Sequence, residues 1–418
     1  MHYDYLIIGG GIASVSAAEA IRSVDAQGSI GILSRESGFL YSRVLLPRYV
    51  RGSVEREKVF LRTPDHYARF NIDLHAGISA VAVNFDTQQV HVSVGGALTF
   101  GKLLIAAGGM PRRWNIPINE NDRVVRLHTI DDADRARTLF QEAHERKQDV
   151  LLVGGGFISL EFIGCAVAYG LRARCFIRER KFFDEWLDEK GWNLLYTNLA
   201  HHGVEVSPET ELKELHSESD RVQVVTAGGD TVEGGFLGLG IGIERNYGIF
   251  QGTGVEVQRG IVVDQFLQTA HENVWAAGDI AEYFDVIFNE HRIVNNWTSA
   301  FLQGRTAGMN MAAASREDQR PFQAVSVYSI TSLGFQITFL GRCEAKDNAD
   351  NIVRTWEDAR GYERIFFEGG TVKGAVLINR FSDKTLLARF IESKEDISSF
   401  KNMLWDPNYD IKNMAHAR

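Results

Sequence analysis

Two glycine clusters in the 418-residue chain have the residue types of phosphate-binding turns. They read Gly9-x-Gly11-x-x-Ser14 and Gly154-x-Gly156-x-x-Ser159. Glycine at these positions lets backbone amides and the N-terminus of a following helix come close to a pyrophosphate group. Because each cluster follows a short apolar run and precedes a helical pattern, each is predicted to be the phosphate-binding turn of a nucleotide-binding unit.

Two acidic residues elsewhere in the chain are placed to bind sugars. Glu36 follows the predicted strand Ile30–Leu33, the position from which a carboxylate binds a ribose hydroxyl. Asp279 follows Gly278 directly after a short apolar strand, where its carboxylate could accept hydrogen bonds from a sugar alcohol. The first unit is therefore predicted to bind its nucleotide through both phosphate and sugar.

Basic residues occupy the corresponding place in the second unit. The predicted strand 172–177 leads to Arg178, Arg180 and Lys181, cations that could pair with the 2′-phosphate of NADPH. Glu179 lies among them and could instead bind the ribose of NADH. NADPH is therefore favoured, and NADH is kept as the alternative.

The elements around the two turns must hold them at the ends of parallel strands. The pattern of strand, glycine turn and helix at residues 5–21 recurs at residues 150–169, which predicts two nucleotide-binding units of the α/β class. After Pro321, apolar residues alternate with polar ones, as they do in the strands of an antiparallel sheet. This change of pattern predicts a separate C-terminal α+β domain.

Composition and charge narrow the classes of partner. A formal net charge of −9 provides no global basic field, so neither nucleic acid nor a membrane is expected as a partner. Three cysteines are too few and too scattered for a disulfide scaffold or a CxxC pair. No metal site is predicted, and His128 and the pair His201-His202 are interpreted as surface or linker residues. Since the N-terminus has no signal peptide pattern, we expect a reducing, cytoplasmic compartment.

In their order along the chain, these motifs resemble those of the flavoprotein reductases of the pyridine nucleotide-disulfide oxidoreductase superfamily. The branch most similar contains the rubredoxin reductases, ferredoxin reductases and nitrite-reductase-associated NAD(P)H oxidoreductases. The resemblance covers nearly the whole chain. It rests on Gly9–Ser14 with Glu36, Tyr41–Arg43, Leu45-Leu46, Ala106–Gly108, Gly154–Glu161, Gly242, Gly278-Asp279 and Trp297–Gly304.

The resemblance implies an α/β fold with two Rossmann-like dinucleotide-binding domains, for FAD and NAD(P)H, and a C-terminal α+β interface domain. The FAD-binding domain would comprise segments 1–114 and 246–320, the NAD(P)H-binding domain 115–245, and the interface domain 321–418. Asp279 would hold the ribityl chain of FAD, and a helix starting near Trp297 would direct its N-terminus at the flavin pyrimidine carbonyl. The cofactor-binding residues that we predict are Gly9, Gly11, Ser14, Glu36, Arg43, Ala107, Gly108, Gly154, Gly156, Ser159, Arg178, Arg180, Gly242, Gly278, Asp279 and Trp297.

Two departures from the family pattern concern the chemistry. The flavin-facing stretch 38–48 has no cysteine, so dithiol chemistry is excluded there, and Cys165 and Cys175 are interpreted as small buried residues. Related reductases pair a lysine beside the flavin with a glutamate of the nicotinamide domain, and this chain has Arg48 and Glu161 at those places. Because arginine stays protonated, we predict an electrostatic role for Arg48 and Glu161 in hydride transfer, with an ordinary surface ion pair as the alternative.

The implied reaction takes a hydride from NAD(P)H onto FAD and passes electrons singly to a small carrier protein, such as a rubredoxin or ferredoxin. Two alternatives use the same site. One is an NAD(P)H oxidase or quinone reductase, and the other is a redox-sensing binding protein that resembles apoptosis-inducing factor. The oligomeric state is left open between a monomer and a homodimer.

Overall fold

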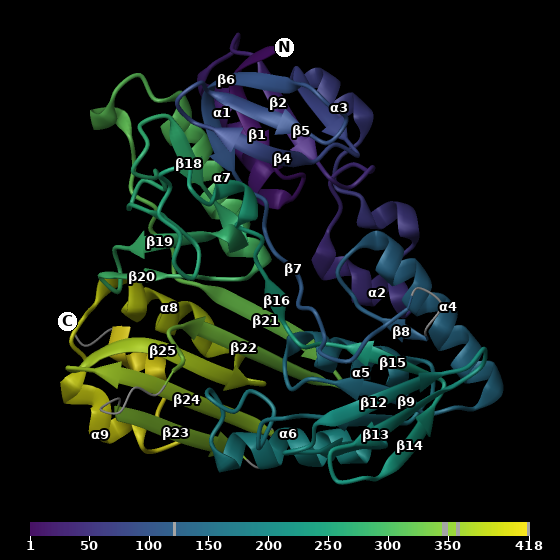
Figure 1. Cartoon of the computed structure of the whole chain (residues 1–418). Coiled ribbons are helices and arrows are strands. Elements are labelled where there is room, and N and C mark those ends of the chain that lie inside the picture. The colour runs from purple at the N-terminus through teal and green to yellow at the C-terminus, as the bar shows by residue number, and fades with distance from the viewer. Residues whose placement is uncertain (120–122, 345–349, 357–359, 416–418) are drawn as a thin grey trace. The chain divides into compact units, whose positions relative to one another are not determined.

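The computed structural model describes residues 1–119, 123–344, 350–356 and 360–415, and they form two compact units (Figure 1). One unit comprises residues 1–42, 56–110 and 244–324, and the other comprises residues 43–55, 111–243 and 325–418. The short strands β7 (Met110–Pro111) and β16 (Ile243–Glu244) lie where the chain passes from one unit to the other.

The first unit is built on a sheet whose strands follow the order β3-β2-β1-β6-β5-β4, with β18 paired to β6. Strands β3, β2, β1, β6 and β18 run parallel to one another. The second half of β1 and all of β2 are buried, as expected for strands in a parallel sheet whose faces are covered. The strands are β1 (His2–Ile8), β2 (Ile30–Ser34), β3 (Ile72–Ala76), β4 (Ala80–Asn84), β5 (Gln89–Val92), β6 (Ala97–Ile105) and β18 (Val274–Ala276), with a small sheet of β17 (Ile261–Val263), β19 (Ala281–Asp285) and β20 (Glu290–Arg292).

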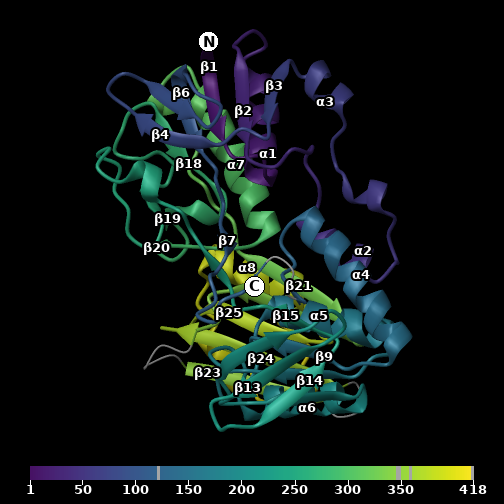
Figure 2. The ribbon, with the colours of Figure 1, turned by 45° about the vertical axis from the view of Figure 1, so that its right-hand side comes forward.

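Helices α1 (Ile12–Val24) and α7 (Trp297–Ala312) pack against each other in this unit, and α3 (Pro64–Arg69) lies beside β3 (Figure 2). Small residues allow the close approach of α1 and α7. A Cβ atom on Gly304 would stand 2.1 Å from the carbonyl oxygen of Ala13, so no larger residue fits there. This contact ties the N-terminal helix to a segment almost 300 residues away in the chain.

The second unit contains a parallel sheet with the order β11-β10-β9-β15-β8 and a three-stranded antiparallel sheet, β12-β13-β14. A capping box formed by Thr129 and Asp132 begins α4. The strands are β8 (Val124–Val125), β9 (Val150–Val153), β10 (Ala173–Phe176), β11 (Val204–Ser207), β12 (Leu212–Ser217), β13 (Val222–Thr226), β14 (Thr231–Gly234) and β15 (Phe236–Leu239), and the helices are α2 (Leu46–Val50), α4 (Ile130–Arg146), α5 (Phe157–Ala168) and α6 (Glu189–His201).

The C-terminal part of the second unit is an antiparallel sheet with the order β21-β22-β25-β24-β23, against which α8 packs. This arrangement confirms the predicted α/β fold with a C-terminal α+β part. The elements are β21 (Val327–Ser332), β22 (Phe335–Gly341), β23 (Asp350–Trp356), β24 (Gly361–Glu368), β25 (Thr371–Ile378), α8 (Lys384–Ser393) and α9 (Lys401–Leu404).

Residues 43–55, which we placed in the 1–114 segment, pack within the second unit. The apolar side chains of Leu46 and Val50 in α2 are buried, and α2 packs against α4 and α5. The Tyr49 hydroxyl also donates to Asp134 Oδ1 at 2.6 Å. Among the described residues, no helix has both the length and the apolar character needed to cross a membrane.

Candidate functional site

The first glycine turn lies between the end of β1 and the start of α1, as predicted. Gly9 has a φ of +122°, and a Cβ atom there would stand 2.2 Å from the carbonyl oxygen of Ala106 at the end of β6. Gly11 is the N-cap of α1, and a Cβ atom on it would meet no protein atom within 4 Å. The turn therefore leaves open space directly in front of a helix N-terminus, where an anionic group is stabilised.

Ser14, on the first turn of α1, is fully buried, and its hydroxyl has no hydrogen-bond partner within the described structure. A buried hydroxyl without a partner is unfavourable unless a bound group or water satisfies it. Together with the open space at Gly11, this orphaned group fits a nucleotide phosphate at the turn.

Glu36 follows β2 at the position predicted for a ribose ligand. Its carboxylate accepts a hydrogen bond from the Tyr41 hydroxyl at 2.5 Å, and the side chain is half-buried. The tyrosine therefore fixes the direction of the carboxylate at the carboxyl end of the parallel strands, which is where α/β sheets bind ligands.

The segment around Gly278 connects the sheet to α7. The Gly278 amide donates to Oε1 of the buried Gln303 at 2.8 Å, and the carbonyl of Asp279 accepts from the Arg245 guanidinium. Asn296 caps α7 by accepting from the Ser299 amide, and Trp297 packs half-buried against the core of this unit. Asp279 and the N-terminus of α7 are thus held by the same hydrogen-bonded segment.

The remaining residues predicted for the first nucleotide have different surroundings. Gly108, after β6, has a φ of +64°, and Ala107 before it is exposed. The Arg43 guanidinium donates to the backbone carbonyl of His128 in the second unit. The role of Arg43 in FAD binding stays a prediction.

The second glycine turn repeats the geometry of the first. Gly154 has a φ of +118°, and a Cβ atom there would stand 2.3 Å from the carbonyl oxygen of Gly240. Gly156 is the N-cap of α5 and, like Gly11, would carry a Cβ atom with no protein atom within 4 Å. Ser159 is buried beside Gly240, and Gly242, with a φ of +89°, accepts a hydrogen bond from the Arg112 amide.

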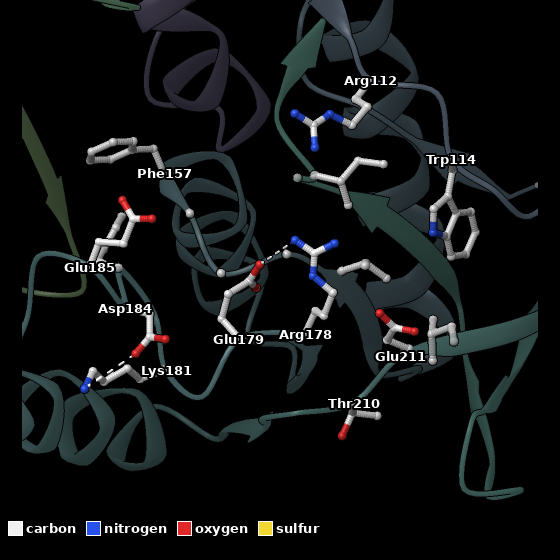
Figure 3. A pocket seen from close by; sticks show the side chains of 18 of the residues that line it. Arg112, Trp114, Phe157, Arg178, Glu179, Lys181, Asp184, Glu185, Thr210 and Glu211 are labelled. Atoms are coloured by element: carbon white, nitrogen blue, oxygen red, sulfur yellow. Dashed lines mark hydrogen bonds and ion pairs between the residues drawn. The ribbon is translucent and has the colours of Figure 1, made fainter.

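A cavity of about 530 Å³ opens in front of this turn (Figure 3). The glycine turn forms its floor, and the loop between β10 and α6 forms one wall. The volume is within the range of small-molecule and cofactor sites. The lining residues are 112–115, 153–157, Arg178, Glu179, Lys181, 183–186, 210–212, Gly240 and Ile241.

Two of the three cations predicted to select NADPH have acidic partners. The Arg178 guanidinium pairs with the Glu179 carboxylate at 3.2 Å, and the Lys181 ammonium pairs with Glu189 at 3.2 Å and Asp184 at 3.5 Å. Arg180 is exposed and is not among the described residues that line the cavity, so its role in nucleotide binding stays a prediction.

Glu179, which we kept as the alternative ligand, does face the glycine turn. Its Oε2 atom lies 3.7 Å from the position of a Cβ atom on Gly155. A carboxylate at this place is suited to the two ribose hydroxyls of NADH and repels a 2′-phosphate. The role of Glu179 as a ribose ligand stays a prediction.

Sequence reasoning missed Arg112, Arg113 and Trp114, which line the opposite side of the cavity. Neither arginine side chain forms an ion pair with the described part of the chain, and in Figure 3 the Arg112 and Arg178 guanidinium groups face the same part of the cavity. These residues lie at the predicted domain boundary, 114–115, away from either glycine motif. The signal was present in two adjacent arginines followed by a tryptophan.

Glu161, on α5, has a different ion partner from the one predicted. Its Oε2 atom lies 3.4 Å from Nη2 of Arg51, whereas Arg48 is exposed and forms no ion pair within the described residues. The predicted Arg48–Glu161 pair is therefore wrong. Arg51 follows Arg48 by almost one helical turn and faces α5, where a Cβ atom on Gly164 would stand 3.2 Å from Nη1 of Arg51.

Burial changes the acidity of this carboxylate. Desolvation raises the pKa of Glu161 from its ordinary value of 4.5 to about 7, and the nearby Arg51 offsets only part of the effect. The folded protein therefore binds a proton more tightly than the unfolded chain, and stability falls as pH rises from about 4.5 to about 7.

Replacing Glu161 by glutamine is expected to remove this pH-dependent cost. Relative to the wild type, Glu161→Gln should gain about 2 kcal/mol in unfolding free energy between about pH 5.5 and pH 8.5. Urea unfolding of both proteins at the two pH values measures this difference. Glu142→Gln is the control, because its pKa is lowered by Arg123 and its loss should not stabilise the protein as pH rises. A constant difference between wild type and Glu161→Gln would contradict the prediction.

The three cysteines are all buried and unpaired, which confirms the interpretation of Cys165 and Cys175. Burial raises the pKa of both thiols, so neither is activated as a nucleophile. No group of three or more metal-binding side chains was found in the ranges that the structure describes.

Comparison with known proteins shows which protein family this chain matches. A model of the pyridine nucleotide-disulphide oxidoreductases matches residues 3–304, and a model of the rubredoxin NAD+ reductase C-terminal domain matches residues 329–395. The chain belongs to the pyridine nucleotide-disulphide oxidoreductase family. It is therefore an FAD-dependent oxidoreductase of nicotinamide nucleotides, which confirms the predicted cofactor classes.

Relatives match this family member over almost its full length. The NADH-dependent phenylglyoxylate dehydrogenase subunit epsilon of Aromatoleum evansii is 27% identical over 405 residues, which are 96% of this chain and 94% of that protein. Putidaredoxin reductase of Pseudomonas putida is 24% identical over 423 residues, covering 99% and 97% of the two chains.

Solved structures share the fold. The reductase in a covalent putidaredoxin reductase–putidaredoxin complex superposes with a TM-score of 0.91 at 22% identity, covering 99% of this chain and 98% of that one. The NADH:rubredoxin oxidoreductase of Clostridium acetobutylicum gives a TM-score of 0.76 at 21% identity, covering 97% and 99%.

Proposed function

We propose that this protein oxidises NADH and passes the electrons, through FAD, to a small iron–sulfur or rubredoxin-type carrier protein. The observation that carries the proposal is the presence of two dinucleotide-binding turns in one chain, each with open space before a helix N-terminus. The matched relatives include proteins named as reductases of putidaredoxin and rubredoxin. Because the three thiols are buried and unpaired, electrons leave the flavin without a protein dithiol.

In this proposal the first unit holds FAD. Its pyrophosphate lies at the turn formed by Gly9, Gly11 and Ser14, and Glu36 binds the adenosine ribose. A single hydrogen-bonded segment holds Asp279 and the N-terminus of α7. Bound FAD supplies the chemistry of accepting a hydride and releasing electrons one at a time. The protein supplies binding and orientation through these backbone amides and carboxylates.

The second unit binds NADH. Gly154, Gly156 and Ser159 form its phosphate turn, and Glu179 accepts hydrogen bonds from the adenosine ribose. Arg112 and Arg178 lie where they can contact the diphosphate, because both line the cavity (Figure 3). Glu161 on α5 and Arg51 at the end of α2 form a part-buried ion pair, and we propose that Arg51, rather than Arg48, is the partner of Glu161 in hydride transfer.

We also propose a cytoplasmic location, since the three free thiols suit a reducing compartment. The proposal for the reaction does not depend on this location.

Anaerobic titration of the FAD-loaded protein tests the function. We expect NADH to bleach the flavin absorbance with a second-order rate constant about tenfold or more above that of NADPH, because Glu179 repels the 2′-phosphate. Adding oxidised rubredoxin or a [2Fe–2S] ferredoxin should then restore the absorbance within the turnover time. No bleaching by either nucleotide would contradict the proposal.

The acceptor is tested on the same sample. Reoxidation by air as fast as by every carrier would favour an oxidase, and reduced protein that persists for minutes in air and with carriers would favour a redox sensor. If NADPH bleached the flavin faster than NADH, this result would contradict the proposed role of Glu179 but not the proposed reaction.

A further inference from the structure

One wall of the nucleotide cavity is a loop that belongs to no sheet. It connects the end of β10 with the start of α6 and contributes Arg178, Glu179, Lys181 and residues 183–186 to the lining. Its hydrogen bond to the glycine turn runs from the Phe183 amide to the carbonyl of Gly155. A loop that presents several side chains to a ligand keeps a single conformation when residues outside the site pack against it.

Aromatic packing from the C-terminal sheet provides part of this support. Phe339 of β22 is buried, and its ring centroid lies 5.1 Å from that of Phe157, 5.2 Å from that of Phe183 and 4.9 Å from that of Trp186. All three of these partners line the cavity, whereas Phe339 does not. Tyr328 of β21 also contacts Phe157, with ring centroids 4.2 Å apart.

A buried cation fixes the backbone of the same loop. Arg364 of β24 is 9% exposed, and its Nη1 atom donates to the carbonyl oxygen of Trp186 at 3.2 Å. Its Nε atom donates to Oδ1 of Asn351 at 3.2 Å, and the guanidinium lies 4.7 Å from the ring centroid of Phe366. The contacts with Asn351 and Phe366 hold the guanidinium in one orientation. Its hydrogen bond to Trp186 in turn holds the loop.

We infer that Arg364 and Phe339 are positioning residues of the nucleotide site, so that the C-terminal sheet is a structural part of this site. This inference rests on the proposed function, because it takes the cavity to be the NADH site. We predicted the C-terminal domain as an interface for a carrier, and the contacts give it a second role. Neither side chain would touch the ligand, because both contact the loop residues 183–186 instead.

The test compares Arg364→Met with wild type in the FAD-loaded protein. Methionine keeps the apolar stem and removes the hydrogen bond to Trp186. We expect the dissociation constant for NADH, from anaerobic stopped-flow reduction, to rise by about tenfold, the effect of one lost hydrogen bond from a charged donor. The limiting reduction rate at saturating NADH should stay within about twofold, because the reacting atoms are not contacted.

Three further variants separate positioning from general stability. Arg342→Met removes another buried guanidinium, which directly follows β22 of the same sheet, pairs with Glu368 and does not line the cavity. It should leave the NADH dissociation constant unchanged. Arg364→Gln, whose amide can still donate to the Trp186 carbonyl, should recover most of the wild-type affinity. Phe339→Leu, which keeps the core filled, should also weaken NADH binding.

Wild-type affinity in both Arg364→Met and Phe339→Leu would overturn the inference, as would equal weakening in Arg342→Met. If the wild-type protein itself shows no NADH-dependent reduction, the proposed function fails and the inference fails with it. The two failures are therefore distinguished by the wild-type measurement.

Discussion

Gly156→Val should leave the protein yellow with bound FAD but lower the rate of flavin reduction by NADH by about a hundredfold or more at fixed nucleotide concentration. Gly156 is the N-cap of α5, with φ −120° and ψ −165°, an extended conformation that valine adopts readily. A Cβ atom there would meet no protein atom within 4 Å. The valine therefore fills space that belongs to the ligand without straining the chain.

The size of the effect follows from the hydrogen bonds that the valine prevents. A diphosphate at a helix N-terminus accepts hydrogen bonds from several backbone amides, each worth about 1.5–3 kcal/mol when the acceptor is charged. A branched side chain in front of α5 blocks the close approach that these bonds require, so that the absence of two of them suffices for the predicted reduction.

Stopped-flow reduction by NADH measures the loss, and two controls define its cause. Dithionite should reduce the flavin of Gly156→Val as completely as that of the wild type, because it needs no nucleotide site. Gly228→Val places the same side chain at an exposed turn glycine of this unit, where the nearest atom is 3.6 Å away. Normal NADH reduction in Gly156→Val would mean that the nucleotide does not bind at this turn.

The glycine turns were predictable from sequence because their geometry is local. Gly9 and Gly154 have positive φ values, and the motif of strand, glycine turn and helix that requires them is contained in a short stretch of sequence. The strand before each turn and the helix after it are equally local, because apolar periodicity reports them. The fold class followed directly from these two segments.

The ion partner of Glu161 could not be predicted with the same certainty. Arg48 and Arg51 lie three residues apart, and which of them faces α5 depends on where α2 begins and how it rotates. Gly164 leaves space beside the Arg51 guanidinium, since a Cβ atom on it would stand 3.2 Å from Nη1 of Arg51. A family motif indicates where a charged residue lies in the sequence. The orientation of the helix then determines which way its side chain points.

The walls of the nucleotide cavity depend on contacts between distant segments. Arg112 faces Arg178 across the cavity, and Arg364 reaches Trp186 over a sequence separation of 178 residues. No periodicity or spacing links such residues, because the tertiary packing of the second unit brings them together. Likewise the pairing of Lys181 with Glu189 and Asp184 removes a cation that sequence alone left available for a phosphate.

The second large effect is expected at the other turn: Gly11→Val should yield protein that is purified without FAD. Gly11 caps α1 with φ −82° and ψ −173°, and a Cβ atom on it would have no protein atom within 4 Å, so the variant should fold. The valine would occupy the space in front of the helix where the FAD diphosphate is proposed to bind. We expect the dissociation constant for FAD to rise by about a hundredfold or more, because the same kind of charged hydrogen bonds can no longer form.

Fluorescence titration of apo-protein with FAD measures this constant, and the ratio of flavin to protein absorbance reports occupancy after purification. Gly228→Val again serves as the matched control and should retain FAD. Because the second turn is unchanged in Gly11→Val, the variant should still bind NADH in an isothermal titration with wild-type affinity to within about threefold, since distant sites act independently. FAD retained at wild-type affinity would place the flavin elsewhere, and loss of both nucleotides would show that the two units do not bind them separately.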